Sequence, residues 1–244
     1  MSNISHKFLA GFCMGIAEIT PGVSGATIAG LFNVYKEFVT FLHVFSPFKL
    51  KPNFKYFSQE INFSFIIPLL IGMAISVYLS AFAVDYLRNN FLYELKIFLS
   101  AVMLIAVIKN CAFDQPFFDS LKYFFDFILG LVMAVIISFS LLELDFNNIF
   151  LLPFAGILAF AAFLLPGISG SLVLVILGVY GNITTAIKDI DVLFLAPFII
   201  GMVLSLLIIP AEIMKRINNN ERKTKVFFSG LISGSIPAVW THLF

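Results

Sequence analysis

The chain has 244 residues, of which 60% are hydrophobic and only 12% are charged. Soluble domains carry about 25% charged residues, and a mean hydropathy of +1.02 is too high for a protein that folds in water. The composition excludes a soluble enzyme and a nucleic-acid-binding protein. It predicts an all-α polytopic membrane protein whose first partner is the lipid bilayer.

Seven apolar stretches follow one another along the chain. They cover 8–42, 65–87, 92–110, 120–142, 150–187, 192–214 and 226–243. Most of them match the roughly 20 residues that a helix needs to cross a bilayer. The weakest is 92–110, where the uncharged segment between Lys96 and Lys109 is short, although both lysines can snorkel. The stretches 8–42 and 150–187 are too long for one span.

Each long stretch is interrupted near its middle by a Pro-Gly-x-Ser-Gly sequence, at 21–25 and at 166–170. Proline removes a backbone donor and glycine is permissive, so no continuous helix is expected through either break. We expect two helices or half-helices in each stretch, either re-entrant or fully crossing. With an even number of crossings in each, twelve of the fifteen basic residues fall on one side. The positive-inside rule makes that side cytoplasmic, with the N-terminus inside and the C-terminus outside.

The two halves of the chain resemble each other. At an offset of 145 residues, and of 129 further on, identities fall at Pro21/Pro166, Gly22/Gly167, Ser24/Ser169, Gly25/Gly170, Tyr35/Tyr180, Pro68/Pro197, Gly72/Gly201 and Lys96/Lys225. Within one membrane domain, we expect a first repeat at 8–110, a linking transmembrane helix at 120–142 and a second, inverted repeat at 150–243. Inverted repeats with broken helices are typical of secondary transporters. The alternative is a pseudo-symmetric scaffold.

The two breaks carry the residues expected to bind a ligand. A half-helix that begins near Ser24 or Ser169 presents free backbone amides and a positive dipole end, which favour an anion such as phosphate. Glycine lets the backbone approach a ligand closely. The candidate phosphate-binding residues are Gly22, Ser24, Gly25, Thr27, Gly167, Ser169, Gly170 and Ser171. In the alternative interpretation, Ser24 and Ser169 only cap their own helices.

Glu18 is the one acidic residue placed deep in an apolar stretch, and its counterpart in the second half is Phe163. Carboxylates inside a membrane are costly and by default indicate a function. Glu18 is therefore a candidate to titrate during transport or to couple a cation. The alternative is a hydrogen-bonded carboxyl group that organises the turn at Pro21.

The remaining polar residues predict no metal site and no cofactor. The histidines are scattered, at His6, His43 and His242. Three basic residues either guide an anionic head group at the membrane surface or serve only as topology determinants, namely Lys36, Arg88 and Arg216.

The segments Met14–Thr27 and Leu164–Ser171 closely resemble the PopT-type family of bacterial polyprenyl-phosphate transporters, and the similarity covers nearly the whole chain. The resemblance implies a transporter rather than an enzyme, with a polyprenyl-phosphate lipid as its partner. It further implies that undecaprenyl phosphate is moved from the outer to the cytoplasmic leaflet of the bacterial cytoplasmic membrane for reuse. The family usually has Asp at the position of Glu18 and Gly at that of Ala26. Whether the chain forms a homo-oligomer stays open.

Two other functions fit parts of the pattern. An undecaprenyl-pyrophosphate phosphatase also uses re-entrant segments in inverted repeats, but phosphoryl transfer needs neutralising arginine and paired carboxylates. Gly25 follows Ser24 and Gly170 follows Ser169, with no arginine beside either break. A secondary transporter of a small anion is the second alternative, because the same amide dipoles would serve it.

Overall fold

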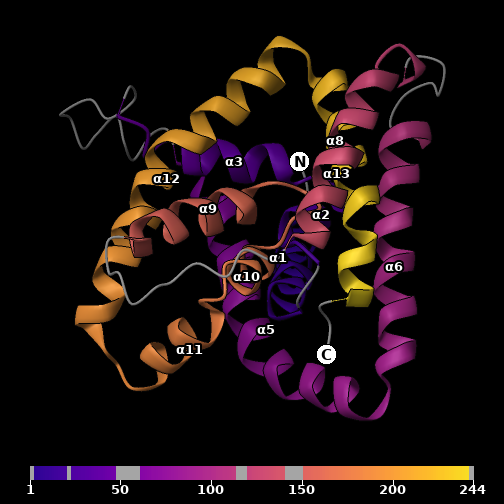
Figure 1. The fold of residues 1–244 in the computed structure, drawn as a ribbon. Coiled ribbons are helices and arrows are strands. Elements are labelled where there is room, and N and C mark those ends of the chain that lie inside the picture. The colour runs from indigo at the N-terminus through magenta and orange to yellow at the C-terminus, as the bar shows by residue number, and fades with distance from the viewer. Residues whose placement is uncertain (1–2, 21–22, 48–60, 114–119, 141–150, 242–244) are drawn as a thin grey trace.

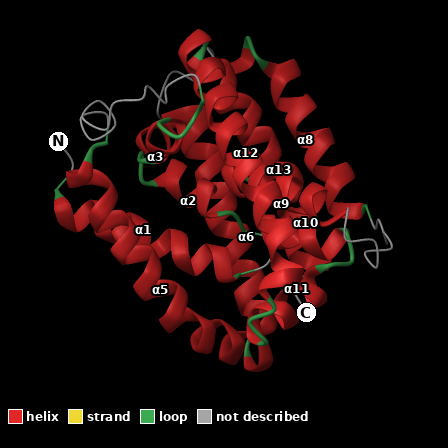
Figure 2. Cartoon of the chain, turned by 90° about the vertical axis from the view of Figure 1, so that its left-hand side faces the viewer, coloured by secondary structure: helices red, strands yellow, loops and turns green. Residues whose placement is uncertain are grey.

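The computed structural model describes residues 3–20, 23–47, 61–113, 120–140 and 151–241. Within these ranges the chain is helical and forms no strand, as Figure 2 shows by the red helices and short green connections. The all-α fold predicted from composition is therefore confirmed for the part of the chain that the structure describes. Ile4 and Thr241 mark the outermost helical residues.

The first half of the chain contains a short-helix region followed by two long helices (Figure 1). Its elements are α1 (Ile4–Ile19), α2 (Gly25–Leu31), α3 (Tyr35–His43), α5 (Phe63–Asn90), α6 (Leu92–Ile108) and the π-turn η1 (Lys109–Phe113). The second half has the same order after one additional helix. Its elements are α8 (Phe124–Phe139), α9 (Leu152–Leu164), α10 (Gly170–Ile176), α11 (Tyr180–Lys188), α12 (Val192–Asn219) and α13 (Glu221–Thr241).

Three helices among the described residues are long and apolar enough to cross a membrane. They are α5 over Phe63–Ser80, α6 with η1 over Leu92–Phe113, and α12 over Val192–Asn219. The predicted spans 65–87, 92–110 and 192–214 are therefore confirmed as apolar helices of sufficient length. The described part of the 120–142 stretch contains the shorter apolar helix α8, and residues 226–241 of the last stretch fall in α13, which is not among these three helices.

Helix α13 lies between α8 and α6, and small residues allow that packing. A Cβ atom on Gly230 would overlap the carbonyl oxygen of Phe127, and one on Gly234 would overlap that of Leu131. Glycine at these positions lets the two helix backbones touch. The same small and polar residues make α13 less apolar than the helices that it packs against.

Each long apolar stretch contains three helices rather than the two expected. The additional turn follows α2 and α10, where Asn33 and Gly178 adopt positive φ values of 57° and 76°. After this residue, the amide of Val34 donates to the carbonyl of Ala29 at 2.9 Å, and that of Val179 donates to Leu174 at 3.0 Å. Backbone bonds of this kind close a helix at a left-handed residue. The pair α10 and α11 is bent by 118° there.

Equivalent elements of the two halves have matching bounds. Helices α2 and α10 begin and end 145 residues apart, as do α3 and α11, and α5 and α12 begin and end 129 residues apart. Close packing recurs at the same offsets: a Cβ on Gly11 would overlap the carbonyl oxygen of Leu69, and one on Gly156 would overlap that of Phe198. As a result, α1 packs against α5 in the way that α9 packs against α12.

Candidate functional site

The two Pro-Gly-x-Ser-Gly breaks lie against each other, although about 140 residues separate them in the sequence. Three hydrogen bonds join them: Ser24 Oγ donates to the Leu165 carbonyl at 3.3 Å, the Gly167 amide donates to Thr27 Oγ1 at 2.8 Å, and the Tyr35 hydroxyl donates to the Leu164 carbonyl at 2.9 Å. Ser24, Thr27 and Tyr35 are all buried. Inside a membrane, unwound backbone is tolerated only where protein or a wet cavity satisfies it, and here side chains of the first segment satisfy backbone groups of the second.

The first break begins α2 at Gly25, directly after Ser24, as the sequence predicted. Its amides are not free, however. The Gly25 amide donates to Glu18 Oε1 at 2.6 Å, the Ala26 amide donates to Ser24 Oγ at 3.2 Å, and the Thr27 amide donates to the Ser24 carbonyl at 2.9 Å. Ser24 thus caps its own helix, and the Glu18 carboxylate occupies the position at which an anion was expected. Gly22 lies outside the described residues.

The second break begins α10 at Gly170. Gly167 has a φ of +97°, and a Cβ atom there would lie 2.6 Å from the Ile232 amide nitrogen, so only glycine fits. Gly170 packs on α9, where a Cβ would lie 2.7 Å from the Ala159 carbonyl oxygen. The Ser169 and Ser171 hydroxyls are 2.7 Å apart and bond to each other, and Ser169 is fully buried. These residues hold the break against its neighbours.

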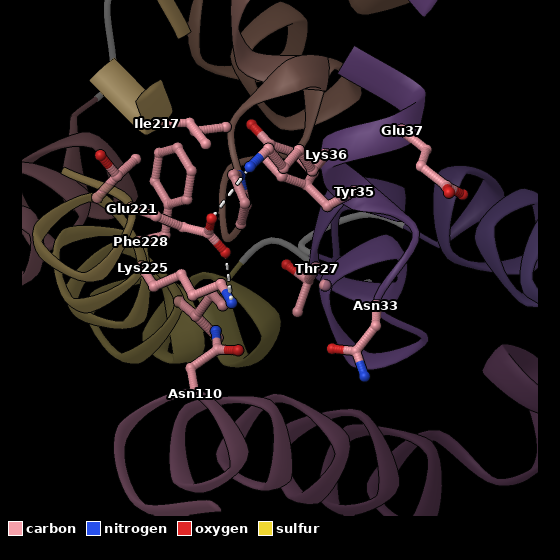
Figure 3. Close-up of a pocket in the computed structure, with 14 residues that line it drawn as sticks. Thr27, Asn33, Tyr35, Lys36, Glu37, Asn110, Ile217, Glu221, Lys225 and Phe228 are labelled. Carbon is pink, nitrogen blue, oxygen red and sulfur yellow. Dashed lines mark hydrogen bonds and ion pairs between the residues drawn. The ribbon is translucent and has the colours of Figure 1, made fainter. Parts of the chain in front are cut away.

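A cavity of about 350 Å³, lined by both polar and apolar residues, lies beside the meeting point of the breaks (Figure 3). Thr27 and Gly30 of α2 and Pro166 of the second break form one part of its wall. Charged and amide side chains from α3, η1 and α13 form much of the rest, at Lys36, Glu37, Asn110, Glu221 and Lys225. Of the predicted phosphate-binding residues that the structure describes, Thr27 is the one that lines this cavity.

Three charged residues form a group across the cavity, which we call the Lys–Glu–Lys bridge: Lys36, Glu221 and Lys225. Lys36 Nζ lies 3.1 Å from Glu221 Oε2, and Lys225 Nζ lies 3.0 Å from Glu221 Oε1 (Figure 3). The bridge links α3 to the first turn of α13. The hydrogen bonds from Lys225 and from Lys36 lower the pKa of the Glu221 carboxyl group below its usual range.

Further bonds hold the cavity wall in place. Lys109 Nζ donates to Asn33 Oδ1 at 2.7 Å, which ties η1 to the turn after α2. The buried guanidinium of Arg222 donates to the carbonyls of Asn110 at 2.6 Å and Cys111 at 3.0 Å, and so satisfies backbone oxygens of η1. Asn110 therefore faces the cavity from a fixed backbone. In the described ranges, no group of three or more His, Cys, Asp or Glu residues could hold a metal ion.

Sequence reasoning found part of this cavity. It named Thr27 as a hydroxyl donor, and it named Lys36 either as a guide for an anionic head group or as a topology determinant; both residues border the cavity. It missed Lys225 and Glu221, although the pairing of Lys96 with Lys225 in the repeat was a signal. Arg216 is exposed and is not among the described residues that line the cavity, and the Arg88 side chain lies outside what the structure describes.

Comparison with known proteins finds relatives that are named polyprenyl-phosphate transporters. A polyprenyl-phosphate transporter of Vibrio cholerae is 27% identical over 250 residues, which cover 98% of this chain and 78% of that protein. A polyprenyl-phosphate transporter of Staphylococcus aureus is 28% identical over 255 residues, which cover 97% of this chain and 86% of that protein. No solved structure gives a significant match.

The family comparison extends over nearly the whole chain. The model of the VCA0040-like family, described as undecaprenyl phosphate translocase-like, matches residues 14–243. Both this description and the names of the relatives indicate a transporter and not an enzyme, as the sequence predicted. The chain therefore belongs to the VCA0040-like, undecaprenyl phosphate translocase-like family.

Proposed function

We propose that this protein flips a polyprenyl phosphate, with undecaprenyl phosphate as the natural substrate, across the bacterial cytoplasmic membrane. The lipid returns to the cytoplasmic leaflet, where the carrier is used again in building the cell envelope. Family membership and the names of the two relatives support transport of this class of lipid. The observation that carries the proposal is a cavity with two lysines, set beside paired backbone breaks in an otherwise apolar helical protein.

The phosphate head group binds in this cavity between Lys36 and Lys225. Both ammonium groups already lie within about 3 Å of one carboxylate, so they are spaced to hold a single anion. Charge-assisted hydrogen bonds of this kind are roughly twice as strong as neutral ones. Thr27 adds a hydroxyl at the wall nearest the breaks. The other predicted phosphate-binding residues at the breaks remain a prediction, and the prenyl chain stays in the lipid phase.

Alternating access follows from two inverted repeats that move against each other. Matching helix bounds and matching glycine contacts in the two halves support this architecture. The broken hairpins are re-entrant, since the seven residues of α10 extend only about 10 Å and the chain then bends. The N-terminus is cytoplasmic and the C-terminus is outside, so the lysine-bearing cavity opens toward the cytoplasm.

Glu18 couples transport to a proton or another cation. Its carboxylate accepts a hydrogen bond from the Gly25 amide at 2.6 Å, directly where α2 begins. A change in the charge of Glu18 would weaken this bond and alter how α2 is held. The position next to the contact between the two breaks supports this role.

A flipping assay in proteoliposomes tests the proposal. Fluorescent polyprenyl phosphate is placed in one leaflet, and its appearance in the other is measured with an imposed proton or sodium gradient. We expect Lys36→Gln and Lys225→Gln each to lower the rate about tenfold or more, because each removes a charged hydrogen bond to phosphate. Lys223→Gln is the matched control, since Lys223 pairs with Asp126 at 3.4 Å and does not line the cavity.

Four results would overturn the proposal. If vesicles that contain the wild-type protein flip polyprenyl phosphate no faster than empty vesicles, the proposed function is wrong. Equal flipping rates in the Lys225→Gln and Lys223→Gln variants would contradict the proposed head-group site. Release of inorganic phosphate from undecaprenyl pyrophosphate would indicate the phosphatase instead, and full competition by small anions would indicate the small-anion transporter.

A further inference from the structure

The Lys–Glu–Lys bridge occupies the two cations that a ligand phosphate would need. Glu221 uses one carboxylate oxygen for each lysine, Oε2 for Lys36 at 3.1 Å and Oε1 for Lys225 at 3.0 Å. The arrangement is that of one anion shared by two cations on different helices, α3 and α13. A phosphate monoester could take the same place with two of its terminal oxygens.

We infer that Glu221 is an internal competitor for the substrate: its carboxylate holds Lys36 and Lys225 in the empty cavity, and the lipid phosphate displaces it. The inference rests on the proposed function and deepens it. Once the head group has been delivered, the carboxylate returns to the lysines and favours release. Glu221 therefore lowers affinity for phosphate and speeds turnover.

The charge of the lipid phosphate favours its displacement of the Glu221 carboxylate from the lysines. The exposure of the three side chains keeps this displacement reversible. A phosphate monoester carries between one and two negative charges near neutral pH, against one for a carboxylate. The side chains of Lys36 and Glu221 are 53% and 43% exposed, and that of Lys225 is 34% exposed. Exposed ion pairs contribute little free energy because water screens them, so the bridge opens at small cost. The released carboxylate can turn into water.

A purely structural role for Glu221 is the competing explanation. Glu221 is the first residue of α13, where an acidic side chain interacts favourably with the helix dipole. The helix start is also held by Asn220, whose Oδ1 accepts a hydrogen bond from the Lys223 amide at 2.9 Å. Glu37 lies in the first turn of α3 and borders the same cavity, but it points away from the bridge (Figure 3). The matched control is Asp126, an acidic residue that pairs with Lys223 at 3.4 Å and does not line the cavity.

The test measures binding of farnesyl monophosphate to the purified full chain in detergent by titration calorimetry, with farnesol as the uncharged reference. We expect Glu221→Gln to bind farnesyl monophosphate roughly three- to tenfold more tightly than wild type, because a competing exposed ion pair is removed. The same variant should flip polyprenyl phosphate more slowly in proteoliposomes, since release is slower. Asp126→Asn should match wild type in both assays.

The outcomes separate this inference from the proposed function. Affinity for farnesyl monophosphate that is unchanged or weaker in folded Glu221→Gln would overturn the competitor role and leave the proposed function standing. A wild-type protein that binds farnesyl monophosphate no better than farnesol would overturn both. If Glu221→Gln does not fold, Glu221→Asp keeps the charge at the helix start but is too short to reach both lysines. It should then show a smaller increase in affinity, and no increase would overturn the inference.

Discussion

Thr27 and Gly167 join the two halves of the protein by one buried hydrogen bond, in which the Gly167 amide donates to Thr27 Oγ1 at 2.8 Å. Thr27 lies in α2, directly after the first Pro-Gly-x-Ser-Gly break, and Gly167 belongs to the second break, whose Pro166 lines the same cavity as Thr27. The contact therefore connects the proposed head-group site to the backbone of the second break. When one half moves relative to the other, this hydrogen bond either breaks or keeps Thr27 and Gly167 moving together.

Replacement of Thr27 by valine should destabilise the protein by about 1–3 kcal/mol. Valine keeps the branched shape but removes the acceptor, so the buried Gly167 amide loses its partner. Thr27→Ser keeps the hydroxyl and should recover most of the loss. Thermal or denaturant unfolding of the purified protein in detergent measures the difference. Equal stability of the valine and serine variants would show that the bond does not hold the breaks together.

Replacement of Gly167 by alanine should be more damaging than the same change at Gly181. At Gly167 the φ of +97° is unfavourable for alanine, and the added Cβ would lie 2.6 Å from the Ile232 amide nitrogen. Positive φ alone costs of order 1–3 kcal/mol. At Gly181 a Cβ meets no atom within 4 Å, so Gly181→Ala should leave stability unchanged or slightly raise it, because alanine favours helix. The comparison of the two melting temperatures checks the prediction.

The contribution of Glu221 to stability should depend on pH in one direction. Its pKa in the folded protein is lowered by Lys225 and Lys36, and an unperturbed glutamate titrates near about 4.3. The stabilisation is therefore complete above about pH 5 and is lost as pH falls through the lowered folded pKa. The other charged group at the cavity wall is Glu37.

The measurement compares the melting temperatures of wild type and Glu221→Gln between about pH 7 and pH 3. The difference should stay constant above about pH 5 and shrink below it. A difference that grows as pH falls would contradict the lowered pKa. High salt should also reduce the difference, because these ion pairs are exposed.

The sequence alone determined the class of fold and the places where its helices break. A low content of charge and a series of long apolar stretches predicted an all-helical membrane protein. The Pro-Gly-x-Ser-Gly sequences predicted that new helices begin after Ser24 and Ser169, as they do at Gly25 and Gly170. These features depend on residues close together in the chain, where proline and glycine act on their own backbone. The left-handed turns at Asn33 and Gly178 were missed, although Asn and Gly are the usual signals for them.

Only the tertiary structure decided which groups meet. The sequence predicted free amides at the first break, but the fold brings the Glu18 carboxylate to the Gly25 amide. It also brings Lys36 to Glu221 across 185 residues, and so creates a charged cavity that no local pattern reveals. Hydrophobic periodicity fixes which face of a helix is buried but not which partner it meets, because apolar packing has no direction. Polar contacts between distant segments follow from that packing and therefore become visible only in the folded chain.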